Sequence, residues 1–160
     1  MAGRTEDMAN RRWTARRKER GQAMVEFALL LPIFLVVIFI IVDFGVGISR
    51  WVIVTNSTRE GARMGAVGAT TGEIADRVAT TSNGLLNPVD VTVYYLDKDA
   101  DGAPGGRGDS VVVESDYNYT FITPLKAFLG LAFDGINFNS CADMRIELPV
   151  SGASSGGTGC

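Results

Sequence analysis

The sequence contains no histidine, and only two of its 160 residues are cysteine. Without histidine, the chain lacks the side chain that most often acts as a general base near neutral pH. The two cysteines do not form a C-x-x-C pair, so zinc and iron–sulfur sites have little support. The chain also has no G-x-S-x-G motif and no phosphate-binding glycine loop between a strand and a helix. These absences argue against catalytic residues, and we predict that the protein is not an enzyme.

Basic charge is scarce beyond the first 21 residues. Residues 1–21 hold seven lysines and arginines against three acidic residues, whereas the remainder holds eight against fifteen. Basic residues beside an apolar span favour the cytoplasmic side of a membrane. An arginine-rich arm that binds nucleic acid is the alternative. The position of the basic segment next to an apolar run favours the role in topology, so we expect no nucleic-acid partner.

The longest apolar run covers residues 23–42 and holds one ionisable side chain, Glu26. A helix of about 20 residues spans roughly 30 Å, the thickness of the hydrocarbon core of a bilayer. Buried core helices are shorter and carry a polar face, and signal peptides have apolar cores of only about 7–15 residues. No A-x-A-like cleavage site follows Val42. The run therefore predicts a retained single-pass anchor in the cell membrane, in contact with the lipid bilayer, with the N-terminus cytoplasmic and the C-terminus extracytoplasmic.

Helical patterns continue beyond this run. The leader shows no periodicity, so we expect the helix to begin at Gln22 and to continue through residues 48–66, where apolar and small residues recur at i, i+3 and i+4. A second, shorter helix is expected to begin at Thr71, as its N-cap, and to end at Gly84.

The pattern then changes to a period of two. Residues 89–96 and 110–122 are rich in β-branched and aromatic residues and are separated by a turn-rich loop, which predicts an antiparallel hairpin. Residues 141–150 predict another strand.

The predicted fold class is α+β, with a long transmembrane helix, a short helix and a small antiparallel sheet. Five regions are expected: a basic cytoplasmic leader (1–21), a transmembrane helix (22–44), an extracytoplasmic helical segment (45–84), a small β-rich exported domain (85–150) and a flexible Gly/Ser tail (151–160).

The loop of the predicted hairpin resembles the opening of a calcium-binding loop. Asp97, Asp99 and Asp101 stand at positions 1, 3 and 5, and glycine follows at position 6. Position 12 should be glutamate but is Gly108; the next residue, Asp109, could replace it, and Ser110 could add an oxygen. Flanking helices are also not expected. A solvated turn is therefore the favoured interpretation, Ca²⁺ binding is the alternative, and no other cofactor is expected.

The two cysteines, Cys141 and Cys160, both fall in the predicted exported part. An extracytoplasmic compartment permits a disulfide, which would close a loop of about twenty residues at the C-terminus. Two free thiols are the alternative.

Glu26 is the fourth residue of the apolar run, where a charge is costly. One interpretation is a carboxylate that reaches water at the nearby membrane surface and has no specific role. The other follows if the chain is cut after Gly21. Gln22 then carries an α-ammonium one helical turn from Glu26, and this ammonium, or that of a neighbouring subunit, would pair with the carboxylate and fix the register between packed helices.

The residues that surround Glu26 resemble a known family. Residues 21–27, GQAMVEF, look like the prepilin cleavage motif of type IV pilins. The longer stretch RGQAMVEFALLLPIFLVVIFIIVDFG, followed by TREGARMGAVG, is similar to TadE-like proteins, which are minor pilins or pseudopilins of the tight-adherence (Flp) pilus system. The similarity covers about residues 20–68, including an aspartate after the span, and continues only in outline.

The resemblance implies a role for each matching residue. Gly21 would precede the cut made by a prepilin peptidase, Gln22 would be the mature N-terminus, Glu26 would set the register, and Phe27 stands where the family commonly has tyrosine. It implies a non-enzymatic component of pilus assembly and cell adhesion, with pilins and other pilus-assembly proteins as partners. The alternative is a membrane-anchored extracytoplasmic binding module, stabilised by calcium and unrelated to pili.

Overall fold

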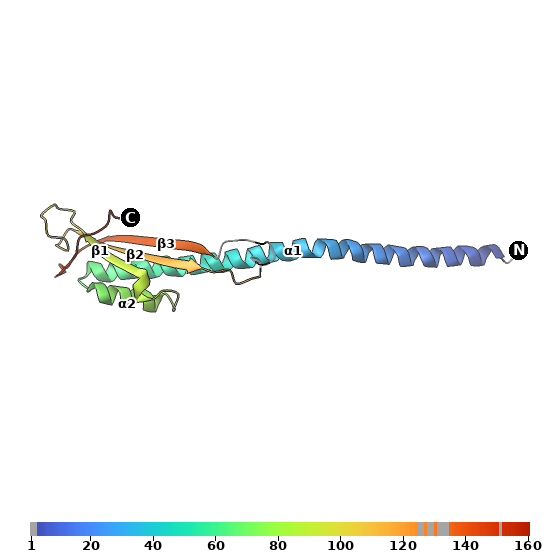
Figure 1. Ribbon diagram of the computed structural model, residues 1–160, viewed down its shortest axis with the longest axis horizontal. Helices are drawn as coiled ribbons and strands as arrows, with labels where there is room; N and C mark the ends of the chain where they lie inside the picture. The colour runs from blue at the N-terminus through green and yellow to red at the C-terminus, as the bar shows by residue number, and fades with distance from the viewer. Residues whose placement is uncertain (1–2, 125–126, 128–129, 131–134, 151) are drawn as a thin grey trace.

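The structure is a computed structural model that describes residues 3–124, 127, 130, 135–150 and 152–160, with side chains from residue 21 onward. One long helix carries a small three-stranded sheet and a second helix beside its C-terminal part, so the predicted α+β class is confirmed (Figure 1). The elements are α1 (Gly3–Ala66), α2 (Thr71–Thr81), the 3-10 turn η1 (Pro88–Asp90), β1 (Val91–Leu96), β2 (Ser110–Tyr119) and β3 (Ile136–Arg145).

Helix α1 is 64 residues long and begins at Gly3, so the expectation that it begins at Gln22 is wrong. The leader is rich in arginine, alanine, glutamate and methionine, which all have good helix propensity, and it contains no proline. Nothing in its sequence therefore stops a helix before the apolar run. The proline inside α1 is Pro32.

The N-cap of α2 lies one residue earlier than predicted. Thr70, and not Thr71, is the N-cap: its side chain accepts a hydrogen bond from the Glu73 backbone N–H, and the Glu73 carboxylate accepts one from the Thr70 N–H. This reciprocal capping box satisfies two backbone donors that a helix start leaves free.

The sheet is antiparallel in the order β1-β2-β3, and the predicted hairpin is its β1–β2 half. The third strand lies five residues earlier than predicted. In β3, Ile136 and Phe138 alternate with asparagines, and the strand ends at Arg145. Ile146 still pairs with Gly108 and Asp109 through backbone hydrogen bonds. The chain then turns to α1, where the Glu147 and Leu148 N–H groups donate to the Ala66 carbonyl at 2.8 and 3.2 Å.

The core lies between the sheet and the two helices. Alternate residues of β2 point toward the C-terminal part of α1, which packs under β2 and β3, while α2 packs under β1. The largest fully buried side chains include Tyr95, Tyr119, Ile74, Ile146 and Val54. The core therefore begins where α1 meets the sheet and does not include the apolar run.

The C-terminal tail is fixed to the sheet, which differs from the flexible tail that was expected. The Tyr95 N–H donates to the Ser154 carbonyl at 3.2 Å, and Tyr95 forms a parallel bridge with Ser155. A Cβ on Gly157, whose φ is +70°, would lie 2.3 Å from Tyr94 Cζ. Glycine is thus required here for the close approach of backbone to an aromatic ring, and not for mobility.

Candidate functional site

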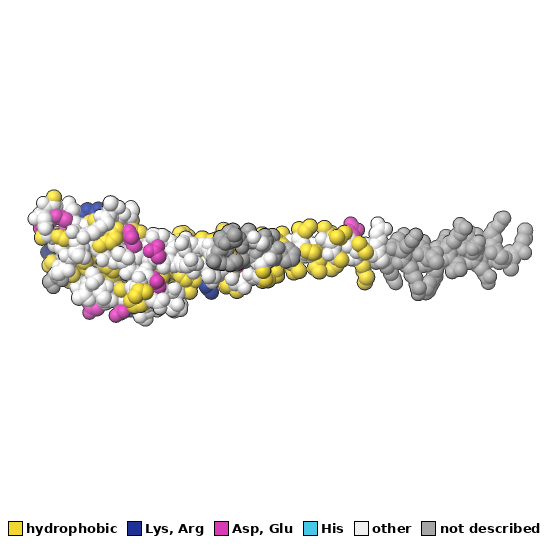
Figure 2. Space-filling model, in the orientation of Figure 1, with side chains coloured by type: hydrophobic (Ala, Val, Ile, Leu, Met, Phe, Trp, Pro, Cys, Tyr) yellow, Lys and Arg dark blue, Asp and Glu magenta, His cyan; other side chains and the backbone are white. Residues whose placement is uncertain are grey.

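The residues that carry the family resemblance lie on the segment of α1 that has no partner in the fold. None of residues 21–42 is buried, and this stretch, which we call the free segment, projects from the sheet as an apolar rod (Figures 1 and 2). The helix from Gly21 has an 18-residue window with a mean hydropathy of 3.1, none of which is buried. A core helix of a soluble protein would be mostly buried. The free segment is therefore a candidate membrane span.

The four predicted processing residues stand on the first turns of the free segment. Gly21, Gln22, Glu26 and Phe27 are all exposed, Phe27 to 65%. Gln22 and Glu26 are four residues apart in a continuous helix, so their side chains lie on the same face, one turn apart. A peptidase, a lipid headgroup or a second helix can reach this face. The geometry is compatible with lateral pairing of Glu26, which is one of the two interpretations of this carboxylate given above.

Asp43 marks the end of the free segment and joins α1 to the sheet. It is only 3% exposed, although it directly follows the apolar run. Its Oδ1 atom accepts hydrogen bonds from the Tyr119 hydroxyl at 3.2 Å and from the Ile122 and Thr123 backbone N–H groups at 2.9 and 3.3 Å. Its Oδ2 atom accepts one from the Thr123 hydroxyl. The carboxylate therefore holds the end of β2 against the helix.

Arg50 continues this junction two turns later. Its guanidinium donates to the Tyr117 hydroxyl at 2.8 Å and lies 5.5 Å from the centre of the Tyr119 ring. A cation over an aromatic face is attracted to the ring. The first two charged residues of α1 after the free segment, Asp43 and Arg50, thus both fix the helix under β2.

The segment TREGARMGAVG is a packing surface in this structure. A Cβ on Gly61 would lie 2.3 Å from Val78 Cγ2, and a Cβ on Gly65 would lie 2.8 Å from Val111 Cγ2. The two glycines, one turn apart, let α2 and β2 approach the backbone of α1. Glu60 adds a salt bridge of 3.0 Å to Arg77 of α2.

The acidic loop lies at the tip of the molecule farthest from the N-terminus (Figure 1). Oxygen atoms of Asp97, Asp99 and Asp109 lie within 4.8 Å of one another, whereas Asp101 is not part of this group. Asp109 is fully buried and accepts backbone hydrogen bonds from Lys98 and Gly106 at 2.9 and 2.8 Å. Within the described part of the chain, the buried Asp97 Oδ1 atom has no hydrogen-bond partner.

The loop shifts two carboxyl pKa values in opposite directions. The Lys98 backbone N–H, with further backbone donors, lowers the pKa of Asp109 despite its desolvation. The Asp101 backbone N–H lowers the pKa of Asp99, but desolvation and the neighbouring carboxyl groups of Asp101, Asp109 and Asp97 outweigh it, so this pKa is raised. The loop thus destabilises the charged form of Asp99 and stabilises the charged form of Asp109, and a bound cation would relieve the repulsion between the carboxylates.

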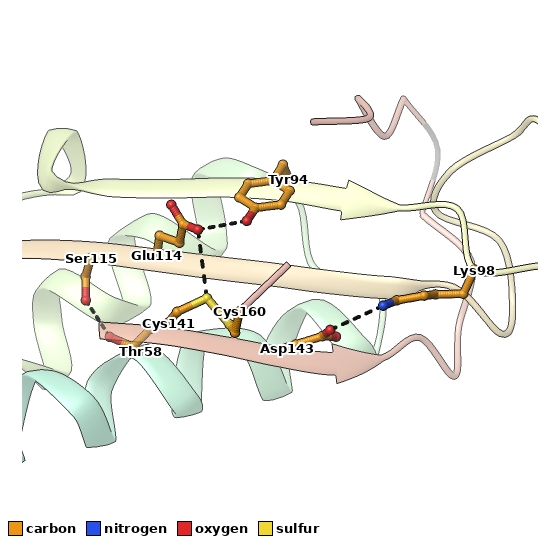
Figure 3. The surroundings of a disulfide bond; sticks show 8 residues. All are labelled: Thr58, Tyr94, Lys98, Glu114, Ser115, Cys141, Asp143 and Cys160. Atoms are coloured by element: carbon orange, nitrogen blue, oxygen red, sulfur yellow. Dashed lines mark hydrogen bonds and ion pairs between the residues drawn. A yellow bond between two sulfur atoms is a disulfide. The ribbon is translucent and has the colours of Figure 1, made fainter. Parts of the chain in front are cut away.

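Cys141 and Cys160 are joined by a disulfide that closes the tail over the sheet, with their Cα atoms 5.6 Å apart (Figure 3). Glu114 lies beside the bond and accepts a hydrogen bond from the Tyr94 hydroxyl at 2.8 Å. On the opposite face, Ser115 points to α1, where its hydroxyl lies 2.5 Å from that of Thr58. The disulfide therefore attaches the C-terminal tail to the face of the sheet that the helices do not cover.

Together these features define a class: a protein with one apolar helix suited to span a membrane, which continues as the packing helix of a small α+β domain. Residues 21–63 match the family model described as TadE-like protein, which confirms the resemblance over those residues. The matched stretch ends within the TREGARMG segment, so it contains the free segment, Asp43 and Gly61. No curated protein and no solved structure shows significant similarity to the chain.

The role of Asp43 was missed at the level of sequence. A charged residue directly after an apolar run is ordinarily interpreted as the point where a helix enters water. The groups that donate to Asp43, which are the Tyr119 hydroxyl and the backbone N–H groups of residues 122–123, lie more than 75 residues away in the chain. These partners cannot be identified from local spacing.

Proposed function

We propose that this protein is a non-enzymatic TadE-like minor pilin or pseudopilin that takes part in the assembly of a tight-adherence (Flp) pilus. The observation that carries the proposal is the match of residues 21–63 to the TadE-like family, together with a free segment that the protein's own fold leaves uncovered. A helix of this kind packs laterally against lipid or against other apolar helices.

In this proposal Glu26 sets the register between packed helices. A carboxylate in an apolar environment is costly by several kcal/mol unless it finds a cation or water. Cleavage after Gly21 by a prepilin peptidase would create an α-ammonium on Gln22, one turn away. Each carboxylate is then satisfied at one axial stagger of neighbouring helices, whereas apolar contacts alone allow many.

The proposed orientation follows from the basic leader. The leader stays in the cytoplasm, the span crosses the cell membrane once, and the sheet and acidic loop are exported, where the Cys141–Cys160 disulfide is stable. Pilins and other pilus-assembly proteins are the proposed partners, and cell adhesion through the pilus is the process they serve.

Affinity capture through the exported domain tests this function. Membranes of cells that express the pilus machinery would be solubilised, and the proteins captured with wild type, Glu26→Ala and a control variant at an exposed glutamate of the exported domain, Glu147→Ala, would be compared by mass spectrometry. We expect pilus proteins with wild type and with the control, and a loss of roughly tenfold with Glu26→Ala, because its register contact is removed. Equal capture by all three would refute the role of Glu26. Capture without any pilus protein would favour the unrelated binding module.

The same preparations reveal processing. A mature chain that begins at Gln22 supports cleavage by a prepilin peptidase, whereas an intact basic leader identifies an uncleaved anchor.

A second proposal concerns the acidic loop: we propose that it binds Ca²⁺ and that calcium stabilises the tip of the exported domain. The supporting observation is the buried, unpartnered Asp97 Oδ1 atom beside the carboxylates of Asp99 and Asp109. Oxygen ligands of this kind suit calcium. Two separate stretches of the loop supply them, since Asp97 and Asp99 lie at one end and Asp109 at the other.

Calorimetric titration of the full chain in detergent with CaCl₂, and with MgCl₂ as a comparison, tests this proposal. Asp97→Asn and Asp109→Asn should each weaken calcium binding by about tenfold or more, because a charged ligand is lost. Asp101→Asn removes the same charge outside the cluster and should have a much smaller effect. The site would be refuted if titration of wild type with CaCl₂ gave no heat of binding, or if all three variants weakened calcium binding equally.

A further inference from the structure

A groove lies at the junction between the free segment and the sheet. It has a volume of about 270 Å³ and is lined on one side by α1 from Ile40 to Trp51 and on the other by the aromatic and aliphatic ends of β2 and β3. Its lining is aliphatic and aromatic apart from Gly47 and Asp43, and the Asp43 carboxylate accepts hydrogen bonds from the Tyr119 hydroxyl and the Ile122 N–H. We call it the junction groove.

The rim of the junction groove exposes large apolar side chains. Phe44 is 69% exposed, Ile48 46%, Trp51 45% and Ile136 44%. A contiguous apolar surface of this kind on a folded domain marks an interaction surface, whereas single exposed apolar residues do not. Phe44 and Ile48 stand one turn apart on the face that continues the free segment. The groove is thus an extension of the apolar rod and not a separate patch.

No exposed charged side chain lies between the free segment and the junction groove in the described part of α1. Asp43 is buried, and Arg50 is held by the Tyr117 hydroxyl and the Tyr119 ring. Among the described side chains, α1 has no exposed charged residue from Phe27 to Val52. At about 1.5 Å per residue this surface is roughly 39 Å long, which exceeds a hydrocarbon core of about 30 Å and approaches a bilayer with its headgroups.

We infer that the junction groove is a lipid site, which takes the acyl chain of a phospholipid from the leaflet nearest the sheet. The bilayer then extends to Trp51, whose indole lies at the interface where tryptophan is enriched. The same placement brings Glu26 close to the opposite headgroup layer, where a charge is least costly. A span of residues 23–42 alone would instead leave Phe44, Ile48 and Trp51 in water. The inference depends on membrane anchorage and not on pilus assembly.

Fluorescence quenching by brominated phosphatidylcholine tests the inference with the full chain in nanodiscs. The chain has two tryptophans, Trp13 and Trp51, so Trp13→Phe leaves Trp51 as the single reporter. We expect bromines near the headgroup end of the acyl chain to remove roughly half or more of the Trp51 emission, and bromines near the methyl end to remove less, as for an interfacial indole. A matched reporter, Trp13→Phe/Trp51→Phe/Phe34→Trp, places a tryptophan in the middle of the free segment and should be quenched most by the deep bromines.

The outcomes separate the inference from its premise. If the Phe34→Trp reporter is quenched but Trp51 is not, the chain spans the bilayer and the groove is not a lipid site. If Trp51 quenching disappears as the number of protein copies per nanodisc rises, a second copy takes the groove and the inference is overturned. If neither reporter is quenched, membrane anchorage itself is wrong, together with the inference.

Discussion

Helix α1 consists of two segments that differ in which side chains are exposed and which are buried. In the free segment, residues 21–42, the large apolar side chains are exposed, as Leu29 is to 71%. In the packed segment, residues 43–66, the buried positions are held mostly by small or polar residues, such as Ser57, Thr58 and Ala62. The rule that apolar residues lie inside a fold would therefore misplace the free segment, which is a candidate membrane span.

The difference shows what each kind of residue does. Exposed large apolar side chains identify the part of α1 that is available to lipid or to other helices. Small residues identify the part that the sheet must approach closely, as Gly61 and Gly65 do beside Val78 and Val111. Asp43 lies at the boundary and belongs to the packed segment. The boundary is therefore set by hydrogen bonds as well as by hydropathy.

The largest expected effect is at this boundary. Asp43→Ala removes the acceptor for the Tyr119 hydroxyl and for two backbone N–H groups, and each buried donor without a partner costs about 1–3 kcal/mol. We expect a loss of about 4 kcal/mol in the free energy of unfolding of the sheet, measured by urea denaturation of the full chain in detergent. Asp43→Asn keeps an oxygen for these donors and should lose less. If both variants unfold like wild type, Asp43 does not hold the two segments together.

Next in size is the effect of the Cys141–Cys160 disulfide, which secures the sheet that packs on α1. Its two residues are 19 apart in the chain, and closing a loop of this size stabilises a fold by about 3 kcal/mol. The double variant Cys141→Ser/Cys160→Ser should therefore unfold at lower urea, and its tail should become sensitive to protease. The single variants serve as controls and should resemble the double one. An unchanged midpoint would mean that the tail adds nothing to the stability of the sheet.

A matched pair of truncations sharpens the comparison within α1. Val54 is fully buried and Leu29 is exposed. Val54→Ala should reduce the free energy of unfolding of the sheet by about 2 kcal/mol, through lost burial and a cavity. Leu29→Ala removes a larger side chain but should leave that free energy within about 0.5 kcal/mol of wild type. Equal losses for the two variants would show that the free segment is part of the core after all.

The smallest expected effect is in the acidic loop, which lies far from the boundary. The pKa of Asp99 is raised in the fold, so its charged form destabilises the loop at neutral pH and its protonation stabilises the loop as pH falls through the folded pKa. Asp99→Asn should therefore raise the Tm slightly at pH 7 without calcium, and this gain should vanish in acid, where the wild-type carboxyl is already neutral.

Asp109→Asn is the matched comparison for this loop. The pKa of Asp109 is lowered, so the charged form contributes stability above the unfolded pKa, and this contribution is lost only as pH falls through the lower folded pKa. The variant should lower the Tm at pH 7. Thermal scans in a calcium chelator from pH 7 to acid would measure the change in Tm for both variants. A change of the same direction in Asp99→Asn and Asp109→Asn at pH 7 would contradict the opposite pKa shifts of the two carboxyl groups.

The sequence predicted those features that depend on local pattern. The hairpin followed from β-branched alternation around a turn-rich loop, and the apolar run identified the free segment. The third strand was placed five residues too late because its asparagines alternate with only two large apolar residues, a weak signal beside the richer stretch after Cys141. The tail was misjudged because glycine favours both mobility and close packing, and only the Tyr94 ring distinguishes the two.

The candidate functional residues show the same division. Gly21, Gln22, Glu26 and Phe27 were predicted as a processing site because their motif is contiguous, and they lie together on the free segment. Asp97, Asp99 and Asp109 were found as a loop pattern, but only the structure separates Asp101 from them. Asp43 and the junction groove depend on contacts between distant parts of the chain, which no local pattern contains.

The central claim is that the free segment packs against other helices of a pilus system while the packed segment supports the sheet. Site-specific photo-cross-linking tests it most directly, with a photoreactive residue at Leu29 in cells that express the pilus machinery and, as a control, at Thr80 on α2. The account predicts protein adducts from Leu29 that contain pilins or other pilus-assembly proteins, and that decrease with Glu26→Ala. Adducts from Leu29 with lipid alone, under conditions in which pili assemble, would contradict it.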